Sequence, residues 1–161
     1  MVTWAEFEAA APELAAEGRR LLYREGEGQA MLATVRGTDE PPRMNPITIG
    51  IVGGRVHAFI LHSPKLVDLE TDGRYALHSH HDPAAPSEFA LRGRTLLVED
   101  DAVRSSVAAG WPFEVDDTYR LFEFSIDSAL VGHRPTADDW PPKYTSWKSD
   151  AATKRAASAK R

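Results

Sequence analysis

The sequence predicts a mainly β protein, a six-stranded antiparallel split β-barrel of Greek-key type with short flanking helices. Apolar residues recur at every second position in short stretches, which is typical of half-buried strands. Gly53-Gly54 separates two of these stretches and favours a tight hairpin. No regular alternation of strand and helix is present, so a parallel sheet is not expected. The stretches are six in number and cover residues 29–36, 43–52, 55–62, 74–81, 88–98 and 119–127.

Residues 1–27 predict two short helices or one kinked helix. Thr3 and Glu6 have the spacing of a capping box, and Trp4 and Phe7 follow on one helical face. Pro12 cannot lie inside a helix but can begin one. The next helical turns carry an apolar stripe made of Leu14, Gly18, Leu21 and Leu22.

The other predicted elements follow from local signals. Pro46 lies within the strand at 43–52, so we expect an edge position or a bulge there. A helix is predicted at 64–71, and a second one, capped by Asp100 or Asp101, ends near Gly110. The last strand is expected to continue, after a bend, through 130–133. Residues 134–150 are expected to be irregular, and the basic tail at 151–161 frayed or weakly helical.

Length and composition predict one globular domain at 1–150, with helices at 1–27 and the barrel at 28–134. The chain has 161 residues, no cysteine and a net charge of −5. The missing cysteines exclude disulfides, cysteine–zinc sites and thiol nucleophiles. A general nucleic-acid surface is not expected at this charge, and no apolar run has membrane-spanning length. We therefore expect a cytoplasmic protein.

An anion site is predicted where the strand at 55–62 meets the helix at 64–71. Ser63 suits the cap before the helix, and Pro64 suits its first position. Lys65 then lies in the first turn, where the helix dipole favours an acid. A cation there is explained by a phosphate bound to the free backbone N–H groups, the Ser63 hydroxyl and the Lys65 ammonium. The alternative is a capped surface helix with a solvated lysine.

Arg43 is predicted to lie close to this helix start. It begins the strand at 43–52, and the hairpin at Gly53-Gly54 brings the following strand back antiparallel to it. Arg43 and Lys65 would then meet at one end of the barrel, as two cations of a phosphate site. The alternative for Arg43 is a solvated position at a strand end.

The ordered motifs resemble those of the pyridoxamine 5′-phosphate oxidase-like family of flavin-binding split barrels. The resemblance covers about residues 28–132, and the opening Trp4 and Phe7 add to it. Its motifs are Pro-Arg-x-x-Pro from Pro42 to Pro46, the Gly53-Gly54 hairpin, Ser-Pro-Lys-x-x-Asp-Leu from Ser63 to Leu69, Asp-Gly-Arg-x-Ala-Leu-His from Asp72 to His78, and Leu91 with Gly93.

This resemblance implies a homodimer with FMN at its interface and a small-molecule substrate. Arg43, Ser63 and Lys65 would hold the flavin phosphate. The segment 135–150 would lie at the interface, where Trp147 and Lys148 would close the partner's site. The resemblance gives the other cofactor contacts to Asn45, Pro46 and Ile47 along the ring system, to Ile60, Leu61 and His62 along the ribityl chain, and to His80 and His81 at the cleft.

The chain also departs from the family. In the predicted strand at 43–52, the run Arg-x-Val-Leu-Leu-Lys of the true oxidases reads Arg43-Met-Asn-Pro-Ile-Thr48 here, and their C-terminal Arg- and Trp-rich signature is missing. The resemblance therefore does not extend to oxidation of pyridoxamine phosphate. Two alternatives keep the fold: an F420-dependent reductase, with Arg92 and Arg94 facing the cofactor tail, or a haem or flavin carrier. A fourth hypothesis is a cofactor-free oligomeric barrel that acts as an interaction module.

The haem hypothesis rests on the histidines near residue 80. His78 and His80 share one face of a strand, and His81 lies on the other. Such a pair can bind a metal, and one of the three could serve as an axial haem ligand. No third metal ligand is adjacent in the sequence, so we predict no metal site. The other reading is a polar strand end near the interface.

Overall fold

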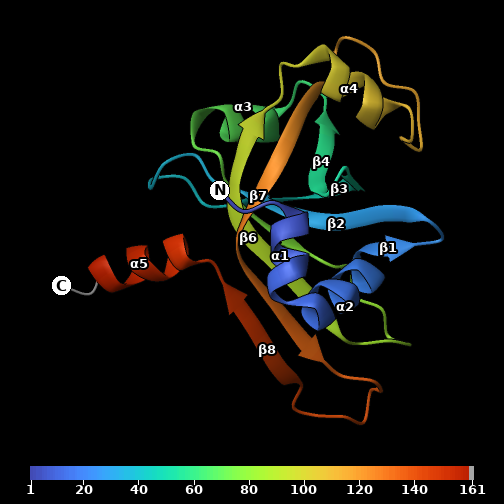
Figure 1. Ribbon diagram of the computed structural model, residues 1–161, viewed down its shortest axis with the longest axis vertical. Helices are drawn as coiled ribbons and strands as arrows, with labels where there is room; N and C mark the ends of the chain where they lie inside the picture. Colours follow the sequence, from blue (N-terminus) through green and yellow to red (C-terminus); the bar gives the residue numbers. More distant parts are fainter. Residues whose placement is uncertain (160–161) are drawn as a thin grey trace.

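The computed structural model describes residues 1–159, and its first two elements are the predicted pair of helices. They are α1 (Trp4–Ala10) and α2 (Pro12–Leu22). The capping box is present, because the backbone N–H of Thr3 donates to Glu6 Oε2 at 2.7 Å and the Glu6 N–H donates to Thr3 Oγ1 at 3.3 Å. Trp4 and Phe7 are fully buried. The two helices pack against the barrel, in contact with β6 and β7 (Figure 1).

The six predicted strands form a closed antiparallel barrel, so the fold prediction is confirmed. The barrel order is β2-β3-β4-β7-β6-β5, and pairing of β2 with β5 closes it. The ends of the strands differ from the predicted ends by a few residues. The strands are β2 (Glu27–Thr34), β3 (Arg43–Val52), β4 (Arg55–Ile60), β5 (Arg74–His78), β6 (Glu88–Leu97) and β7 (Arg120–His133).

Two further strands were not predicted. β1 (Tyr23–Arg24) pairs with β2, and β8 (Lys143–Lys148) pairs with the second half of β7. The expectation that 134–150 is irregular is therefore wrong for β8. Only Trp147 in this strand is half-buried and the other side chains are exposed, so no alternation of apolar and polar residues marked it in the sequence.

Three more helices connect or follow the strands. They are α3 (Pro64–Thr71), α4 (Asp101–Ala108) and α5 (Asp150–Ser158). The basic tail forms α5, which projects from the body (Figure 1) and is linked to β7 by an ion pair of 2.7 Å between Arg155 and Asp127. The remaining cations of the predicted tail, Lys160 and Arg161, lie outside the described residues.

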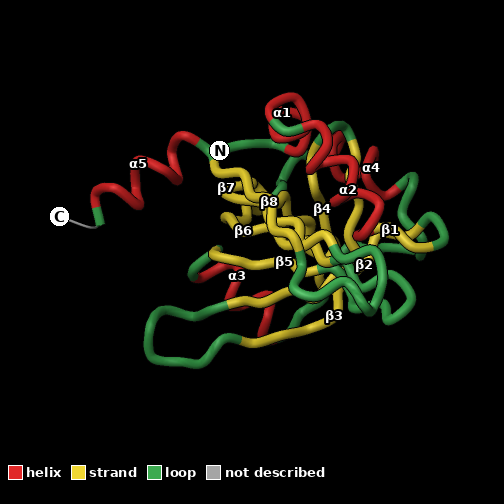
Figure 2. The backbone as a smooth tube through the Cα atoms, turned by 90° about the horizontal axis from the view of Figure 1, so that it is seen from below, coloured by secondary structure: helices red, strands yellow, loops and turns green. Residues whose placement is uncertain are grey.

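The barrel is split along β3. Residues 43–49 of this strand pair with β2 alone, because β4 pairs only with Gly50, Ile51 and Val52. Pro46 therefore occupies a strand edge, as predicted. The β2–β3 loop extends away from the barrel on the same side as α3 (Figure 2), and the Gly37 N–H in it donates to Asp72 at 3.1 Å.

Candidate functional site

The start of β3 and the start of α3 line one pocket of about 300 Å³, here called the β3–α3 pocket. The hairpin after β3 brings the chain back to the Arg43 end, as the sequence predicted. Arg43 and Lys65 therefore line the same pocket. The complete lining is Arg43, Met44, Asn45, Ser63, Pro64 and Lys65.

The helix start in this pocket carries a positive charge. Ser63 is the cap, with its Oγ accepting from the Leu66 N–H at 3.4 Å and its hydroxyl donating to the Leu61 carbonyl at 2.9 Å. The first turn of α3 contains no acid. Within residues 1–159, Lys65 has no carboxylate within 4.0 Å, and no ion pair forms there. Its ammonium and the helix N-terminus thus present positive charge to the same pocket.

Arg43 contacts two acids of different kinds. Its terminal nitrogen lies 2.8 Å from Glu40 Oε2, and the two side chains are 40% and 47% exposed. Its Nε lies 3.2 Å from Asp68 Oδ2, and the Asp68 side chain is only 1% exposed. One partner is therefore a surface acid that an incoming anion could replace, and the other is part of the protein interior.

Asp68 and Arg36 were missed as site residues by the sequence analysis. Asp68 lies on α3 and accepts from Thr34 Oγ1 at 2.8 Å and from Arg36, whose terminal nitrogen is 2.7 Å away. The available signal was the spacing between Leu66 and Leu69, which places Asp68 on the buried face of the helix. A burial pattern does not identify ion-pair partners, so Arg36 left no signal.

A second pocket of about 270 Å³, here called the His80 pocket, continues along β3. Pro46 and Ile47, which were predicted to contact the cofactor ring, lie here with the half-buried His80. Successive residues of β3, at the edge that does not pair with β4, line the two pockets. The lining is Gln29, Pro46, Ile47, Thr48 and His80.

Leu61 and His62 lie in neither lining. Both are exposed and connect β4 to α3, and Leu61 contributes its carbonyl to the Ser63 hydroxyl. Leu61 is 45% exposed and Met44 is 64% exposed. Large apolar side chains are therefore accessible beside the β3–α3 pocket.

Trp147 and Lys148 are placed apart from the β3–α3 pocket of their own chain. The Trp147 ring packs 5.1 Å from that of Phe7 on α1, and Figure 2 shows α1 and α3 on opposite sides of the strands. Both residues line a small pocket of about 130 Å³ on β6, β7 and β8, together with Arg92. If these two residues contact a cofactor at the β3–α3 pocket, that cofactor is bound by another subunit.

Of two other histidines, His78 lies within hydrogen-bond distance of neighbouring groups and His57 is buried. His78 Nε2 lies 3.2 Å from Glu88 Oε2, and its Nδ1 lies 2.6 Å from the Ser79 carbonyl. His57 is 2% exposed and neither ring nitrogen has a hydrogen-bond partner within the described part of the chain. Burial lowers the pKa of His57, with a smaller opposing effect of Glu123. In residues 1–159 no cluster of three or more His, Asp or Glu side chains is arranged to hold a metal ion.

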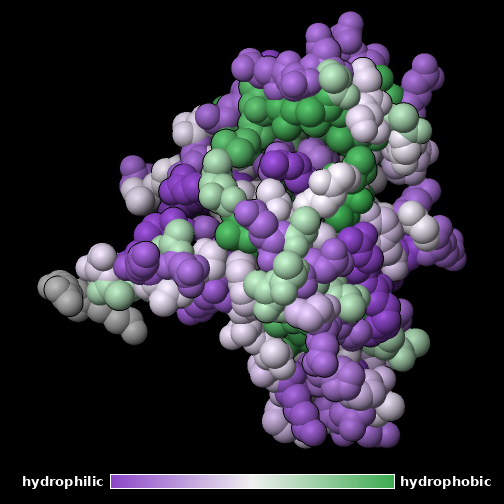
Figure 3. Space-filling view, viewed as in Figure 1, coloured by the Kyte–Doolittle hydropathy of each residue, from purple (hydrophilic) through white to green (hydrophobic). Residues whose placement is uncertain are grey.

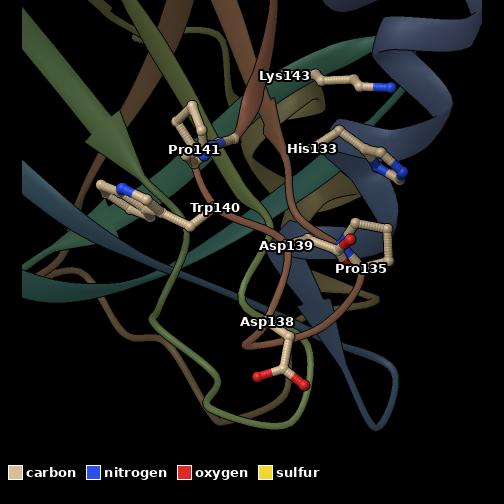
Figure 4. A pocket seen from close by; sticks show the side chains of 8 residues that line it. His133, Pro135, Asp138, Asp139, Trp140, Pro141 and Lys143 are labelled. Carbon is tan, nitrogen blue, oxygen red and sulfur yellow. The ribbon is translucent and has the colours of Figure 1, made fainter.

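A pocket of about 610 Å³, larger than the β3–α3 pocket, lies at the loop between β7 and β8 (Figure 4). Its polar side chains do not converge: Trp140 points to one side, whereas His133 and Lys143 point to the other. Asp139 forms hydrogen bonds within the loop: its Oδ2 accepts from the Thr136 hydroxyl at 2.7 Å and from the Thr136 N–H at 2.9 Å. On the face in Figure 3 this loop region is mostly hydrophilic, whereas hydrophobic residues gather toward the level of α3 and α4. The β3–α3 pocket remains the better candidate.

No protein-family model and no curated protein sequence matches this chain. Several solved structures are similar to it. One is a protein related to general stress protein 26, of the pyridoxinephosphate oxidase family, from Clostridium acetobutylicum, with 16% identity and a TM-score of 0.56 over 92% of this chain and 98% of that one. PhzG from Burkholderia lata 383, in complex with tetrahydrophenazine-1-carboxylic acid, has 14% identity and a TM-score of 0.56 over 90% and 93%.

A heme binding protein from Mycobacterium smegmatis is also similar, with 16% identity and a TM-score of 0.56 over 78% of this chain. The chain spans only 55% of that protein's length. At these identities the similarities establish the fold alone. Among the described residues, no helix is both long and apolar enough to cross a membrane.

Proposed function

We propose that this chain, which has the split-barrel fold of the pyridoxamine 5′-phosphate oxidase-like proteins, binds FMN and acts as a flavin-dependent oxidoreductase. The observation that carries this proposal is the β3–α3 pocket, where Arg43, Lys65 and the α3 N-terminus meet. A phosphate dianion matches this set, because Arg43 and Lys65 are cationic and the positive end of the α3 dipole lies at the same pocket.

The neighbouring residues fit the rest of such a cofactor. Asn45, Pro46 and Ile47 run along the open edge of β3 from one pocket to the next, where a flat ring system would contact them. Leu61 and His62 would lie along the ribityl chain, and His80 would close the far end. When bound, the flavin supplies the redox chemistry, and the chain's own residues bind and orient it.

A homodimer is part of this proposal. Met44 and Leu61 expose apolar surface beside the pocket, and a second copy would cover it. Trp147 and Lys148 of the second subunit would then close the site. The substrate is proposed to be a small molecule other than pyridoxamine phosphate, because the run at 43–48 departs from that of the true oxidases.

Haem is the second candidate cofactor. The half-buried His80 lines a pocket at the same strand edge and could act as an axial ligand. The similarity to the mycobacterial heme binding protein supports this candidate at the level of the fold. F420 remains a third candidate on the same fold.

The ultraviolet–visible spectrum of the purified protein tests the proposal, recorded before and after addition of FMN, F420 or haemin. A flavin spectrum, or uptake of one FMN per subunit, is expected. A Soret band or a deazaflavin band would replace FMN by the corresponding cofactor. Uptake of none of the three would contradict the cofactor site and favour an interaction module.

A further inference from the structure

Asp68 holds two arginines from two different segments of the chain. Its Oδ1 contacts Arg36, at 2.9 Å from Nε and 2.7 Å from a terminal nitrogen. Its Oδ2 contacts Arg43 Nε at 3.2 Å and accepts from Thr34 Oγ1 at 2.8 Å. The carboxylate is therefore fully engaged, and it joins the ends of β2 and β3 to helix α3.

Holding a short helix in place with a buried carboxylate is unfavourable in free energy, because the charge loses its hydration. Taking the charge out of water is unfavourable unless each oxygen is paired, and an apolar side chain of similar volume often stabilises a protein equally well. Leu66 and Leu69 already provide apolar contacts for the same face of α3, and both are almost completely buried. Helix packing alone therefore does not explain an acid at position 68.

The charges at this cluster leave Arg43 able to bind a further anion. Two guanidiniums share one carboxylate, so one positive charge remains uncompensated by Asp68. Asp68 binds Arg43 through Nε, whereas the acid that contacts a terminal nitrogen of Arg43 within residues 1–159 is the exposed Glu40. Exposed ion pairs of this kind contribute little, and a phosphate dianion can replace Glu40.

We propose that Asp68 is a positioning residue for the anion site. It fixes the Arg43 guanidinium by its Nε so that the terminal nitrogens serve the ligand phosphate, and Arg36 balances the carboxylate charge that would otherwise neutralise Arg43. This inference rests on the proposed binding of FMN. It assigns opposite effects to the two acids that contact Arg43: Asp68 supports phosphate binding, whereas Glu40 competes with the phosphate for Arg43.

Fluorescence titration of the full-length chain with FMN, and in parallel with riboflavin, tests this inference. Asp68→Asn and Glu40→Gln each remove one negative charge beside Arg43. We expect Asp68→Asn to lower FMN affinity about ten-fold and Glu40→Gln to raise it about two- to three-fold. Riboflavin affinity should change in neither variant, because riboflavin lacks the phosphate.

Two further variants complete the test: one is a matched control, and the other replaces Asp68→Asn if that variant does not fold. Asp72→Asn removes a similar carboxylate at the opposite end of α3, where Asp72 pairs with Arg74 at 2.5 Å, and it should leave FMN affinity unchanged. If Asp68→Asn does not fold, Arg36→Gln takes its place. Arg36 is not part of the pocket lining, yet its loss leaves Arg43 alone to balance Asp68, so FMN affinity should again fall while riboflavin affinity is retained.

The outcomes separate this inference from the proposed function. If the wild-type chain binds no FMN, the proposed function and the inference both fail. If the wild-type chain binds FMN and Asp68→Asn binds it equally well or more tightly, as charge removal alone would predict, only the inference fails. Parallel losses of FMN and riboflavin affinity would likewise reduce Asp68 to a structural residue.

Discussion

Arg43 and Asp68 form an ion pair of 3.2 Å between the first residue of β3 and the middle of α3. Lys65 lies on the same helix, about one turn before Asp68. The pair therefore links the strand that carries one cation of the β3–α3 pocket to the helix that carries the other. The two cations keep their relative positions because their elements are joined through a buried carboxylate.

Lys65→Ala tests the role of the second cation. If the pocket binds the flavin phosphate, the variant should lose one charge-assisted contact worth about 1.5–3 kcal/mol, so FMN affinity should fall about ten- to a hundred-fold. Arg43→Ala should have a similar effect. Flavin fluorescence titration measures both, and riboflavin should bind all variants equally.

Lys154→Ala provides the matched control, since Lys154 is an exposed lysine of α5. Its loss should leave FMN affinity unchanged. Equal FMN affinity in Lys65→Ala, Arg43→Ala and the wild-type chain would reduce Lys65 to the solvated surface residue of the alternative interpretation.

The barrel could be predicted from the sequence because its signals are local. Alternation in β3 and the turn at Gly53-Gly54 each depend on neighbouring residues, and both glycines have positive φ angles, of 58° and 71°. β8 could not be predicted, because it is held by backbone pairing to β7 and buries little apolar surface. Strand signals come from burial, and pairing without burial leaves none.

Part of the candidate site could also be predicted, because the signals for it are local in the sequence. Ser63 and Lys65 are adjacent in sequence, and Arg43 follows from a single hairpin. Arg36 and Asp68 are different, because their ion pair depends on how α3 is placed against the end of β2. That placement is a tertiary property, and no residue spacing in the sequence encodes it.

Met44→Glu tests the proposed dimer. Met44 is 64% exposed and lines the pocket, so the proposed second subunit would bury it. Glutamate there would replace apolar surface of the interface by a charge that must lose its hydration when the second subunit binds, and the dimer should dissociate. Light scattering coupled to size-exclusion chromatography is expected to give a dimer mass for the wild-type chain and a monomer mass for the variant. Phe113→Glu, at an exposed apolar residue beyond α4, should remain dimeric; a dimeric Met44→Glu would place the interface elsewhere.

Gly93→Ala tests how closely β6 and β7 approach each other. A Cβ at Gly93 would lie 1.8 Å from the Ser125 carbonyl oxygen, and the pairing register shifts between Arg92 and Gly93. Backbone must move to admit a methyl group, so we expect a loss of about 3 kcal/mol in the free energy of unfolding. Gly110→Ala, which meets no atom within 4 Å, should change stability by less than about 0.5 kcal/mol. Equal urea midpoints for the two variants would contradict the close approach.

His57 should make the stability of the fold depend on pH. Burial lowers the pKa of His57 below its ordinary value of 6.5, because the imidazolium is desolvated; Glu123 opposes this effect only in part. Below about pH 6.5 the unfolded chain therefore binds a proton that the folded chain does not. The stability that His57 contributes is complete above that pH and is lost as the pH falls toward the lowered pKa.

His57→Leu removes this titration and also the two ring nitrogens that lack partners. Between about pH 7 and about pH 5, the melting temperature of the wild-type chain should fall more steeply than that of the variant. His133→Leu is the control, because His133 is exposed and its loss should preserve the wild-type slope. Thermal denaturation followed by circular dichroism measures all three slopes. An equal slope in the wild-type chain and His57→Leu would mean that His57 is protonated alike in the folded and unfolded states, and so is hydrated or paired in solution.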